Sequence, residues 1–245
     1  MIKTQMITYQ KLNSLDAIVL AGGKGTRIKN YLKGKPKPLA NIGGYNFLDL
    51  LLNNLTKYNF RKIFILAGFK GDQIYKKYHK KQINFVQIEC VIEKEPLGTG
   101  GALNLLKNKI SNNFFLFNGD TIFDFNYFDM LKYKKEGKHV IALKKSFFSN
   151  AGNKIRNLKI NKNSEVEISN IKSKSIFINA GVYLFEKSIF KILSKKRMSL
   201  ENDILYKLIL GRKIIGIEKK SFFYDIGTKK DFINAERILI KYLKK

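Results

Sequence analysis

The chain has 245 residues, 44% of them hydrophobic, which is enough to bury a full core in one domain. Its formal net charge of +28 suggests nucleic-acid binding, but the basic residues are spread along the whole length. No zinc-ligand spacing, RNP signature or basic heptad accompanies them. We therefore expect an enzyme whose substrates are small polyanions, and no nucleic-acid partner. The one cysteine, Cys90, has no internal disulfide partner and lies in an apolar run, which predicts a core residue.

The sequence also contains no apolar stretch of the length that spans a membrane. Residues 1–14 lack the apolar centre of a signal peptide, so we expect a cytoplasmic protein with no membrane partner. We predict that residues 1–14 are an N-terminal extension and that residues 15–245 form a single domain. A homo-oligomer is compatible with the sequence but is not indicated by it.

Apolar runs of strand length alternate with amphipathic segments over the first 145 residues. The runs read "LDAIVLA", "RKIFILAG", "FVQIECVIE", "NFFLFNGD" and "HVIALKK". Between the first two lies "NFLDLLLNNLTKY", where Phe47, Leu48, Leu51, Leu52 and Leu55 follow the spacing of a core-facing helix stripe. Strands alternating with helices predict an α/β fold with a doubly wound, mostly parallel, Rossmann-like sheet. Such sheets bind ligands beyond the carboxyl ends of their strands.

The pattern changes after about residue 145. The short segments "KIRNLKIN", "SEVEIS" and "SIFINAGVYLF" predict antiparallel strands added to the main sheet. Helices are expected at about 186–194 and 199–210. The chain is then expected to end with a short strand pair around "IIGIEKKSFFYDIG" and a helix from about Lys229.

The first predicted strand ends in the loop "LAGGKGTR", from Leu20 to Arg27. Its glycines let a bare backbone approach a ligand closely, while Lys24 and Arg27 add positive charge, and this combination suits a polyphosphate. The loop fits neither the dinucleotide fingerprint nor the Walker A pattern. The alternative is an ordinary surface turn in a lysine-rich chain.

All three prolines fall in two loops, "KPKPLANIGG" and "EKEPLGTGGA". Proline fixes φ and stiffens a loop, so these loops are candidates for shaped substrate contacts. Lys37 stands between Pro36 and Pro38, which restricts the direction of its ammonium group. Taken alone, either loop could equally be structural.

Seven motifs together resemble the sugar-1-phosphate nucleotidylyltransferase family, whose enzymes join a nucleoside triphosphate to a sugar 1-phosphate and release pyrophosphate. In chain order they are "LAGGKGTR", "KPKPL", "EKEPLGTGGA", "NGD", "NAGVYLF", "SLENDIL" and "YDIGTKKDF", and the resemblance extends from Leu15 to about Ala235. The chain looks most like the D-glycero-α-D-manno-heptose-1-phosphate guanylyltransferases. Alternatives are a mannose-1-phosphate guanylyltransferase, or a cytidylyl-, uridylyl- or thymidylyltransferase. An inactive regulatory or nucleic-acid-binding relative is the alternative from another class.

The resemblance implies roles for individual residues. Arg27, Lys37 and Asp120 would be catalytic, and Asp120 and Asp225 would bind Mg²⁺, which favours a few carboxylates together with phosphate oxygens. By themselves, Asp120 could instead cap a helix and Glu201 could be an acidic residue of a first helical turn. The implied nucleotide-binding residues are Leu20, Ala21, Gly22, Gly23, Gly25, Thr26, Arg27, Glu95, Gly98 and Thr99, and the implied sugar-binding residues are Gly119, Asn179, Gly181, Glu201 and Lys172.

The implied reaction is in-line attack by the sugar phosphate on the α-phosphorus of the triphosphate. The second pKa of phosphate is about 6, so the nucleophile is ionised at neutral pH and no general base is needed. The two histidines, His79 and His139, lie outside all motifs and are expected to be structural. The chain departs from the family in two places. "GTKKD" has Lys229 where proline is usual, and the "RYG" segment and later "EK" pair are missing, which leaves Lys172 as the candidate for the sugar phosphate.

Overall fold

The computed structural model describes residues 14–146, 157–169, 176–194 and 196–243. The predicted extension, apart from Ser14, and Lys172 therefore lie outside the described residues. The chain divides into two compact units. Unit 1 comprises Met1–Pro96, Phe117–Asp124 and Phe222–Lys245, and unit 2 comprises Leu97–Leu116 and Phe125–Ser221. The single domain over residues 15–245 stays a prediction.

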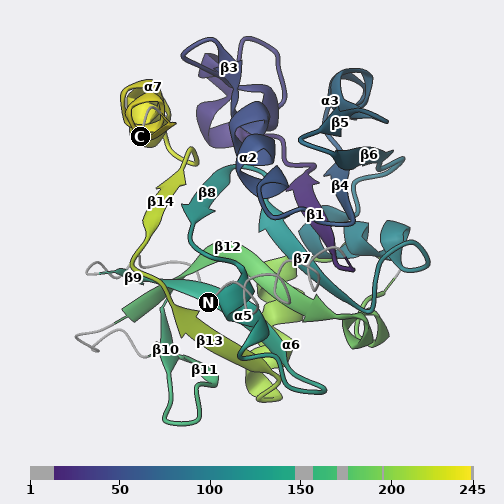
Figure 1. Cartoon of the computed structure of the whole chain (residues 1–245), viewed down its shortest axis with the longest axis vertical. Coiled ribbons are helices and arrows are strands. Elements are labelled where there is room, and N and C mark those ends of the chain that lie inside the picture. Colours follow the sequence, from purple (N-terminus) through teal and green to yellow (C-terminus); the bar gives the residue numbers. More distant parts are fainter. Residues whose placement is uncertain (1–13, 147–156, 170–175, 195, 244–245) are drawn as a thin grey trace. The chain divides into compact units, whose positions relative to one another are not determined.

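Parallel strands form the centre of unit 1. Strands β1 (Asp16–Ala21), β4 (Lys62–Ala67) and β6 (Val86–Ile92) lie side by side in that order (Figure 1). Strands β1 and β4 are almost wholly buried, as the continuous apolar runs predict. Burial alternates along β6, whose other neighbour is the short antiparallel strand β5 (Gln82–Ile83). The predicted parallel sheet is confirmed for these strands.

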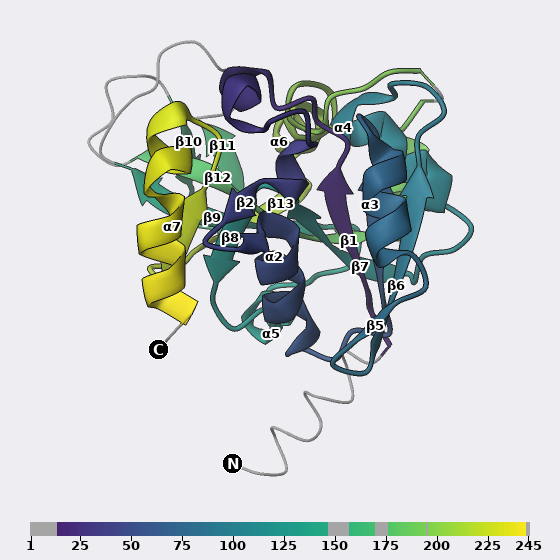
Figure 2. The same cartoon turned by 90° about the horizontal axis from the view of Figure 1, so that it is seen from above.

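Helices and turns connect these strands. Helix α2 (Phe47–Thr56) begins at a capping box formed by Asn46 and Asp49, and the predicted leucine stripe is buried. Helix α3 (Gly71–Tyr78) runs beside β6 (Figure 2). The shorter elements are the 3₁₀ turns η1 (Thr26–Tyr31) and η2 (Lys37–Leu39) and the strands β2 (Asn41–Ile42) and β3 (Tyr45–Asn46).

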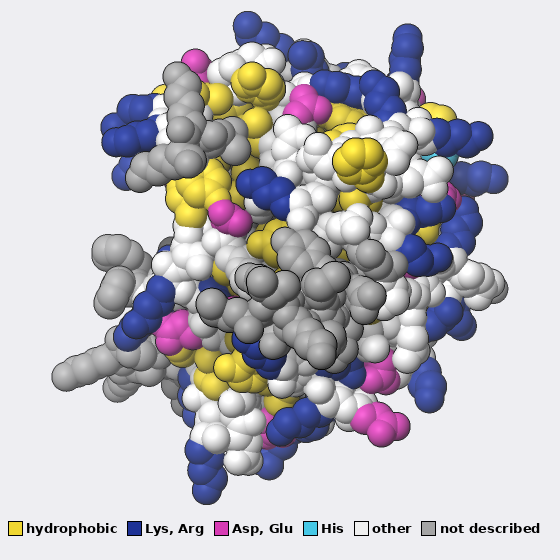
Figure 3. All heavy atoms as spheres, viewed as in Figure 1, with side chains coloured by type: hydrophobic (Ala, Val, Ile, Leu, Met, Phe, Trp, Pro, Cys, Tyr) yellow, Lys and Arg dark blue, Asp and Glu magenta, His cyan; other side chains and the backbone are white. Residues whose placement is uncertain are grey.

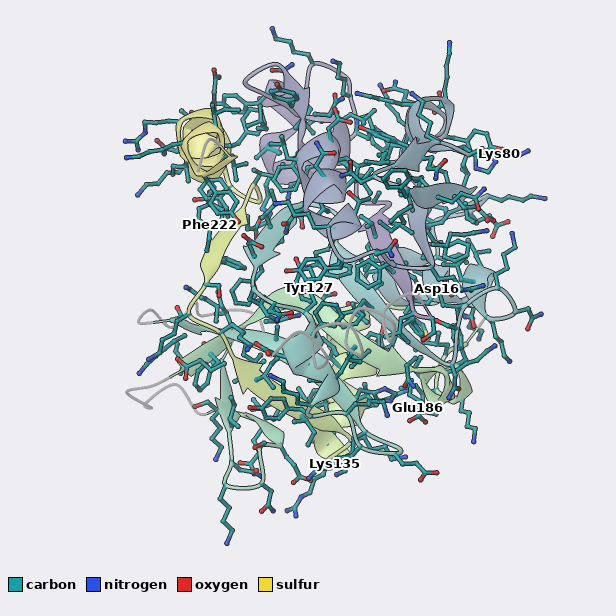
Figure 4. The ribbon with its side chains drawn as sticks, viewed as in Figure 1. Asp16, Lys80, Tyr127, Lys135, Glu186 and Phe222 are labelled. Atoms are coloured by element: carbon teal, nitrogen blue, oxygen red, sulfur yellow. The ribbon has the colours of Figure 1, made fainter. Side chains whose placement is uncertain are left out.

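A two-stranded antiparallel ribbon completes unit 1. It pairs β8 (Thr121–Asp124) with β14 (Phe222–Asp225), so that Thr121 lies opposite Asp225. The C-terminal helix α7 (Lys229–Leu243) packs on β14, where the rings of Phe222 and Tyr242 stack with centroids 3.9 Å apart (Figure 4). The predicted helix from Lys229 is thus confirmed.

Unit 2 contains the antiparallel strands that the later sequence predicts. Strands β9 (His139–Ser146), β10 (Leu158–Ile160), β11 (Val166–Ile168), β12 (Ile176–Glu186) and β13 (Ile214–Glu218) are arranged in the order β11-β10-β12-β9-β13. All these pairs are antiparallel except β9 with β13. Strand β7 (Asn113–Asn118) neighbours β12, and the buried rings of Phe114 on β7 and Phe185 on β12 pack edge to face with centroids 6.1 Å apart.

The predicted pairing of the last two strands is wrong. Strand β13 pairs in parallel with β9, whereas β14 pairs with β8. The burial of each strand gives the reason: the first four residues of β13 are fully buried, which suits a place in the larger sheet, while β14 is only half-buried throughout and suits a ribbon.

The remaining helices of unit 2 are short. The segment predicted as a helix at 186–194 is a 3₁₀ turn, η4 (Lys187–Lys191), and the segment at 199–210 is a π-type turn, η5 (Leu200–Leu205), that continues into α6 (Tyr206–Leu210). The other helical segments are α4 (Gly98–Gly101), η3 (Ala102–Leu106) and α5 (Phe128–Leu131). Within the described ranges, no helix is long and apolar enough to cross a membrane.

Candidate functional site

The glycine loop of unit 1 leaves the carboxyl end of β1 and passes very close to the next loop. A Cβ atom at Gly68 would lie 2.9 Å from the Cα atom of Gly22, and the Phe69 amide donates to the Gly22 carbonyl at 3.1 Å. Gly25 has φ +60°, in the left-handed region that favours glycine. The three glycines of this loop therefore differ: the Gly22 backbone is approached closely by Gly68, Gly25 is favoured by its backbone conformation, and a Cβ at Gly23 would meet nothing within 4 Å.

A carboxylate that the sequence analysis missed lies against this loop. Glu93 follows directly after β6, and its Oε1 atom would lie 2.5 Å from a Cβ at Gly22 and 3.0 Å from one at Gly68. The side chain is half-buried, and its backbone amide donates to the Ala67 carbonyl at 2.8 Å. The sequence did contain a signal for this residue: Glu93 is acidic and lies at the carboxyl end of a predicted strand. The carboxyl ends of parallel strands meet at the edge of the sheet where ligands bind.

Lys37 and Asp120, 83 positions apart, form an ion pair. Lys37 Nζ lies 2.5 Å from Asp120 Oδ2, and the two side chains are 9% and 32% exposed. The Lys37 stem packs against the glycine loop, since a Cβ at Gly25 would lie 3.1 Å from Lys37 Cβ. The Thr121 hydroxyl donates to Asp120 Oδ1 at 3.2 Å. Asp120 is followed by strand β8, so it does not cap a helix.

Asp225 is brought to the same place by the ribbon of β8 and β14. The Ile226 amide donates to the Asp120 carbonyl at 3.1 Å, which joins the two ends of the ribbon. Burial, together with the nearby charge of Asp120, raises the pKa of Asp225 to about 6, against the opposing effect of Lys37 and Arg27. The Oδ1 atom of Asp225 is buried and has no hydrogen-bond partner among the described residues.

Arg27 completes this group, which we call the charged cluster: Arg27, Lys37, Asp120 and Asp225. A Cβ at Gly227 would lie 2.8 Å from Asp225 Oδ1 and 3.4 Å from Arg27 Nη2, so Arg27 and Asp225 approach the same glycine. The structure thus brings together the three predicted catalytic residues and both predicted metal ligands. It also places Gly119 here, because its amide donates to the Leu20 carbonyl at 2.9 Å.

The charged cluster fits a hard divalent cation. Among the described residues no group of three or more His, Cys, Asp or Glu side chains could hold a metal alone. Mg²⁺, however, is commonly held by one or two carboxylates together with phosphate and water oxygens. Asp120 and Asp225 supply these two carboxylates. The buried Oδ1 of Asp225, which has no hydrogen-bond partner among the described residues, is a suitable oxygen ligand.

In unit 2, the second proline loop packs against η5. The amide of Gly100 donates to the Met198 carbonyl at 2.9 Å, and a Cβ at Gly98 would lie 2.5 Å from the same carbonyl. Thr99 Oγ1 accepts a hydrogen bond from the Leu200 amide at 2.8 Å and lies 3.3 Å from Glu201 Oε2. The loop is therefore fixed by backbone contacts that leave no room for side chains at its glycines.

The predicted sugar-binding residues of unit 2 take part in two sets of hydrogen bonds, one around Glu201 and one around Asn179. Glu201 Oε2 accepts from the hydroxyls of Thr99 and Ser199, at 3.3 and 3.2 Å. Asn179 uses both ends of its amide within β12: Nδ2 donates to the Tyr183 hydroxyl at 2.6 Å, and Oδ1 accepts from the Gly181 amide at 3.0 Å. We call Thr99, Ser199, Glu201, Asn179 and Tyr183 the polar group of unit 2.

The histidines take structural positions. His139 is buried in unit 2, where Nδ1 accepts from the Glu186 amide at 3.2 Å, and burial lowers its pKa to about 4. His79 Nδ1 accepts from the Cys90 amide at 3.2 Å in unit 1. Cys90 itself is a free, buried thiol whose pKa burial raises to about 12. Its prediction as a core residue is confirmed.

Comparison with known proteins identifies the family. The sequence matches the family model described as "Nucleotidyl transferase" over residues 16–241. The chain belongs to the nucleotidyl transferase family. This agrees with the resemblance found in the motifs, and its relatives share the mixed α/β fold with parallel and added antiparallel strands.

Individual relatives of this chain carry different names. The chain is 33% identical over 227 residues to D-glycero-alpha-D-manno-heptose 1-phosphate guanylyltransferase of Campylobacter jejuni, covering 89% of this chain and 97% of that protein. It is 32% identical over 242 residues to the bifunctional protein GlmU of Methanococcus vannielii, covering 93% of this chain and 55% of that protein. The chain thus spans about half the length of the GlmU relatives. A structure of HddC from Yersinia pseudotuberculosis complexed with GMP-PN matches with a TM-score of 0.75 and 28% identity, over 91% of this chain and 98% of HddC.

Proposed function

We propose that this chain transfers a nucleotidyl group from GTP to a heptose 1-phosphate, giving the GDP-sugar and pyrophosphate for surface polysaccharide synthesis. The observation that carries the proposal is the charged cluster beside the glycine loop: two cations and two carboxylates from distant parts of the sequence. The names of the heptose-1-phosphate guanylyltransferase relatives and of HddC with GMP-PN support the choice of donor and acceptor.

The chemistry needs charge neutralisation and alignment more than proton transfer. Arg27 and Lys37 would bind oxygens of the triphosphate and offset the charge that develops at the α-phosphorus. Asp120 and Asp225 would hold Mg²⁺, which would neutralise phosphate charge when bound. The attacking phosphate oxygen is ionised at neutral pH, so the structural positions of both histidines are compatible with this reaction.

Glu93 supports guanine as the base. A carboxylate accepts two parallel N–H bonds, and the guanine edge offers such a pair in its N1–H and N2–H₂ groups. The Glu93 carboxylate faces the backbone of Gly22 and Gly68 at the start of the glycine loop. A base bound by that loop would present its edge to Glu93.

The polar group of unit 2 would bind the sugar 1-phosphate. Glu201 and Asn179 are suited to sugar hydroxyls, because carboxylate and amide groups accept and donate the hydrogen bonds that hydroxyls make.

A nucleic-acid partner is not favoured: Lys and Arg side chains are dispersed over the visible face in Figure 3 instead of gathering in one patch.

A pyrophosphate-release assay tests the proposed function. Four nucleoside triphosphates are each combined with a panel of sugar 1-phosphates in the presence of Mg²⁺, and Asp120→Asn serves as the inactive control. The expected result is pyrophosphate release with GTP and a heptose 1-phosphate. Release with another pair would change the substrates and keep the reaction class. No release with any pair would refute the proposed function.

The choice of base is tested by comparing GTP with ITP, which lacks the 2-amino group. The native protein is expected to bind GTP about ten-fold or more tightly than ITP, since a hydrogen bond to a charged group contributes about 1.5 to 3 kcal/mol. In Glu93→Gln this preference should nearly disappear. Glu89→Gln is the matched control, because Glu89 is on β6 and pairs with Lys62 at 2.9 Å. Equal losses for both nucleotides in Glu93→Gln would make Glu93 a structural residue of the loop.

A further inference from the structure

The carboxylate of Asp120 is already bound by protein groups on both of its oxygens. Lys37 Nζ lies 2.5 Å from Oδ2, and the Thr121 hydroxyl donates to Oδ1 at 3.2 Å. Asp225, the other proposed metal ligand, has a buried Oδ1 with no hydrogen-bond partner in the part of the chain that the structure describes. The two carboxylates of the charged cluster therefore differ: one is neutralised by an ammonium group, and the other lacks a direct partner on one oxygen.

A divalent cation and the Lys37 ammonium cannot both use Asp120 without strong repulsion. A metal ion about 2.1 Å from either carboxylate oxygen would lie within a few ångströms of Lys37 Nζ, and like charges at that range repel even in water. The lysine has little room to move away. Its side chain is 9% exposed, its stem packs against Gly25, and prolines flank it on both sides.

A bound polyphosphate would remove this conflict. Phosphate oxygens beside the Lys37 ammonium would accept its hydrogen bonds and offset its charge, so the lysine would need no large movement. Asp120 would then be free to bind a cation. Arg27, on the loop beside Lys37, adds a second cation that attracts the phosphate to the same place.

We propose that Lys37 acts as an internal counter-cation: it holds Asp120 in the protein alone and passes to the phosphate when the nucleotide binds. Divalent cations would then bind the site weakly until the nucleotide is present. By thermodynamic linkage, metal and nucleotide raise each other's affinity by the same factor. The inference rests on the proposed function and adds an order to the binding of its two ligands.

The test is a titration with Mn²⁺ in the absence of any nucleotide, with the free ion measured by electron paramagnetic resonance. Lys37→Met removes the ammonium and keeps most of the apolar stem. This variant is expected to bind Mn²⁺ about ten-fold or more tightly than the native protein, because a neighbouring positive charge is lost. Lys35→Met is the matched control, since Lys35 is an exposed lysine of the same loop, and it should stay within about two-fold of native.

Two further variants make the result decisive. Adding Asp120→Asn to Lys37→Met should abolish the gain in Mn²⁺ affinity if the ion binds at this carboxylate. If Lys37→Met does not fold, Lys37→Gln removes the charge with a polar side chain. Unchanged or weaker Mn²⁺ binding in a folded Lys37 variant would overturn the inference. A failed pyrophosphate assay would instead refute the proposed function, because the Mn²⁺ titration contains no nucleotide.

Discussion

The side chains of the charged cluster of unit 1 and of the polar group of unit 2 differ in how far their hydrogen-bonding groups have partners within the protein. In unit 1, residues from distant segments meet as charges, and no described residue forms a hydrogen bond with the buried Oδ1 of Asp225. In unit 2, Glu201 accepts from Thr99 and Ser199, and Asn179 bonds within its own strand. Residues that satisfy one another stabilise the fold, whereas an unsatisfied buried charge opposes folding and is suited to a ligand.

This difference separates the expected effects of mutation. Substitutions in the charged cluster should remove activity, and substitution of Asp225 should do so while leaving stability unchanged or improved. Substitutions in the polar group of unit 2 should reduce stability and affect only part of the kinetics. Proteins commonly retain destabilising groups where function requires them, so the comparison is also a test of which residues bind the reacting groups.

The largest expected effect is at the two aspartates. Asp120→Asn and Asp225→Asn should each lower kcat by about 10³-fold or more, because the amide keeps the shape and removes the charge that holds the cation. The double variant should lose much less than the product of the two single losses, since residues that act as one unit fail together. Pyrophosphate release at saturating Mg²⁺ measures all three.

Melting temperatures of the same variants sharpen the comparison. Burial and the charge of Asp120 raise the pKa of Asp225 to about 6, so its ionised form is disfavoured in the folded protein. Asp225→Asn should therefore melt at or above the native temperature. A clear fall in melting temperature, combined with retained activity, would make Asp225 a structural residue and remove the contrast between the two units.

The sequence predicted the parallel sheet of unit 1 correctly but did not predict which strand pairs with β14. Continuous apolar runs are sufficient to place β1 and β4 in a buried parallel sheet, because few other structures satisfy two apolar faces. The partner of β14 was not predictable in the same way. Its residues "FFYD" are equally compatible with β13 and β8, and only the half-burial of the ribbon distinguishes them.

The candidate site shows the same limit. Motif order identified Lys37, Asp120 and Asp225, and the structure brings these three residues together across long sequence separations. Glu93 was missed, although it is the first residue of the second proline loop, because it contacts the glycine loop only through the fold. The mutual bonding of Asn179 with Tyr183 likewise depends on a bulge in β12, which local sequence does not specify.

The next effect concerns a buried polar residue of unit 2 outside the site. Burial lowers the pKa of His139 to about 4, so between about pH 6.5 and 4 the unfolded chain binds a proton that the folded chain does not. Stability should therefore fall as pH falls through this range, by about 3 kcal/mol at most from this group. In His139→Asn, whose amide oxygen can replace Nδ1 as acceptor for the Glu186 amide, the decline should be shallower.

Urea unfolding at several pH values between 7 and 4 compares the two proteins, and other titrating groups are common to both. The substitution also removes the edge contact between the His139 and Phe185 rings, so a lower stability at pH 7 is expected in the variant. The informative quantity is the slope with pH. An identical slope in both proteins would show that the burial of His139 contributes nothing to the loss of stability at low pH.

The smallest effect is at Glu201, where the two units can be compared within one kinetic experiment. Glu201→Gln should raise KM for the sugar 1-phosphate about ten-fold, because a hydrogen bond to a charged group becomes one to a neutral amide. KM for GTP and kcat should change little, in contrast to the loss of kcat expected at Asp120. Asp203→Asn is the control: Asp203 accepts from the Ser199 amide at 2.7 Å in the same turn, and the asparagine amide oxygen can accept the same hydrogen bond. If Glu201→Gln lowers only the melting temperature, Glu201 holds Thr99 and Ser199 in place and the sugar is bound by other residues.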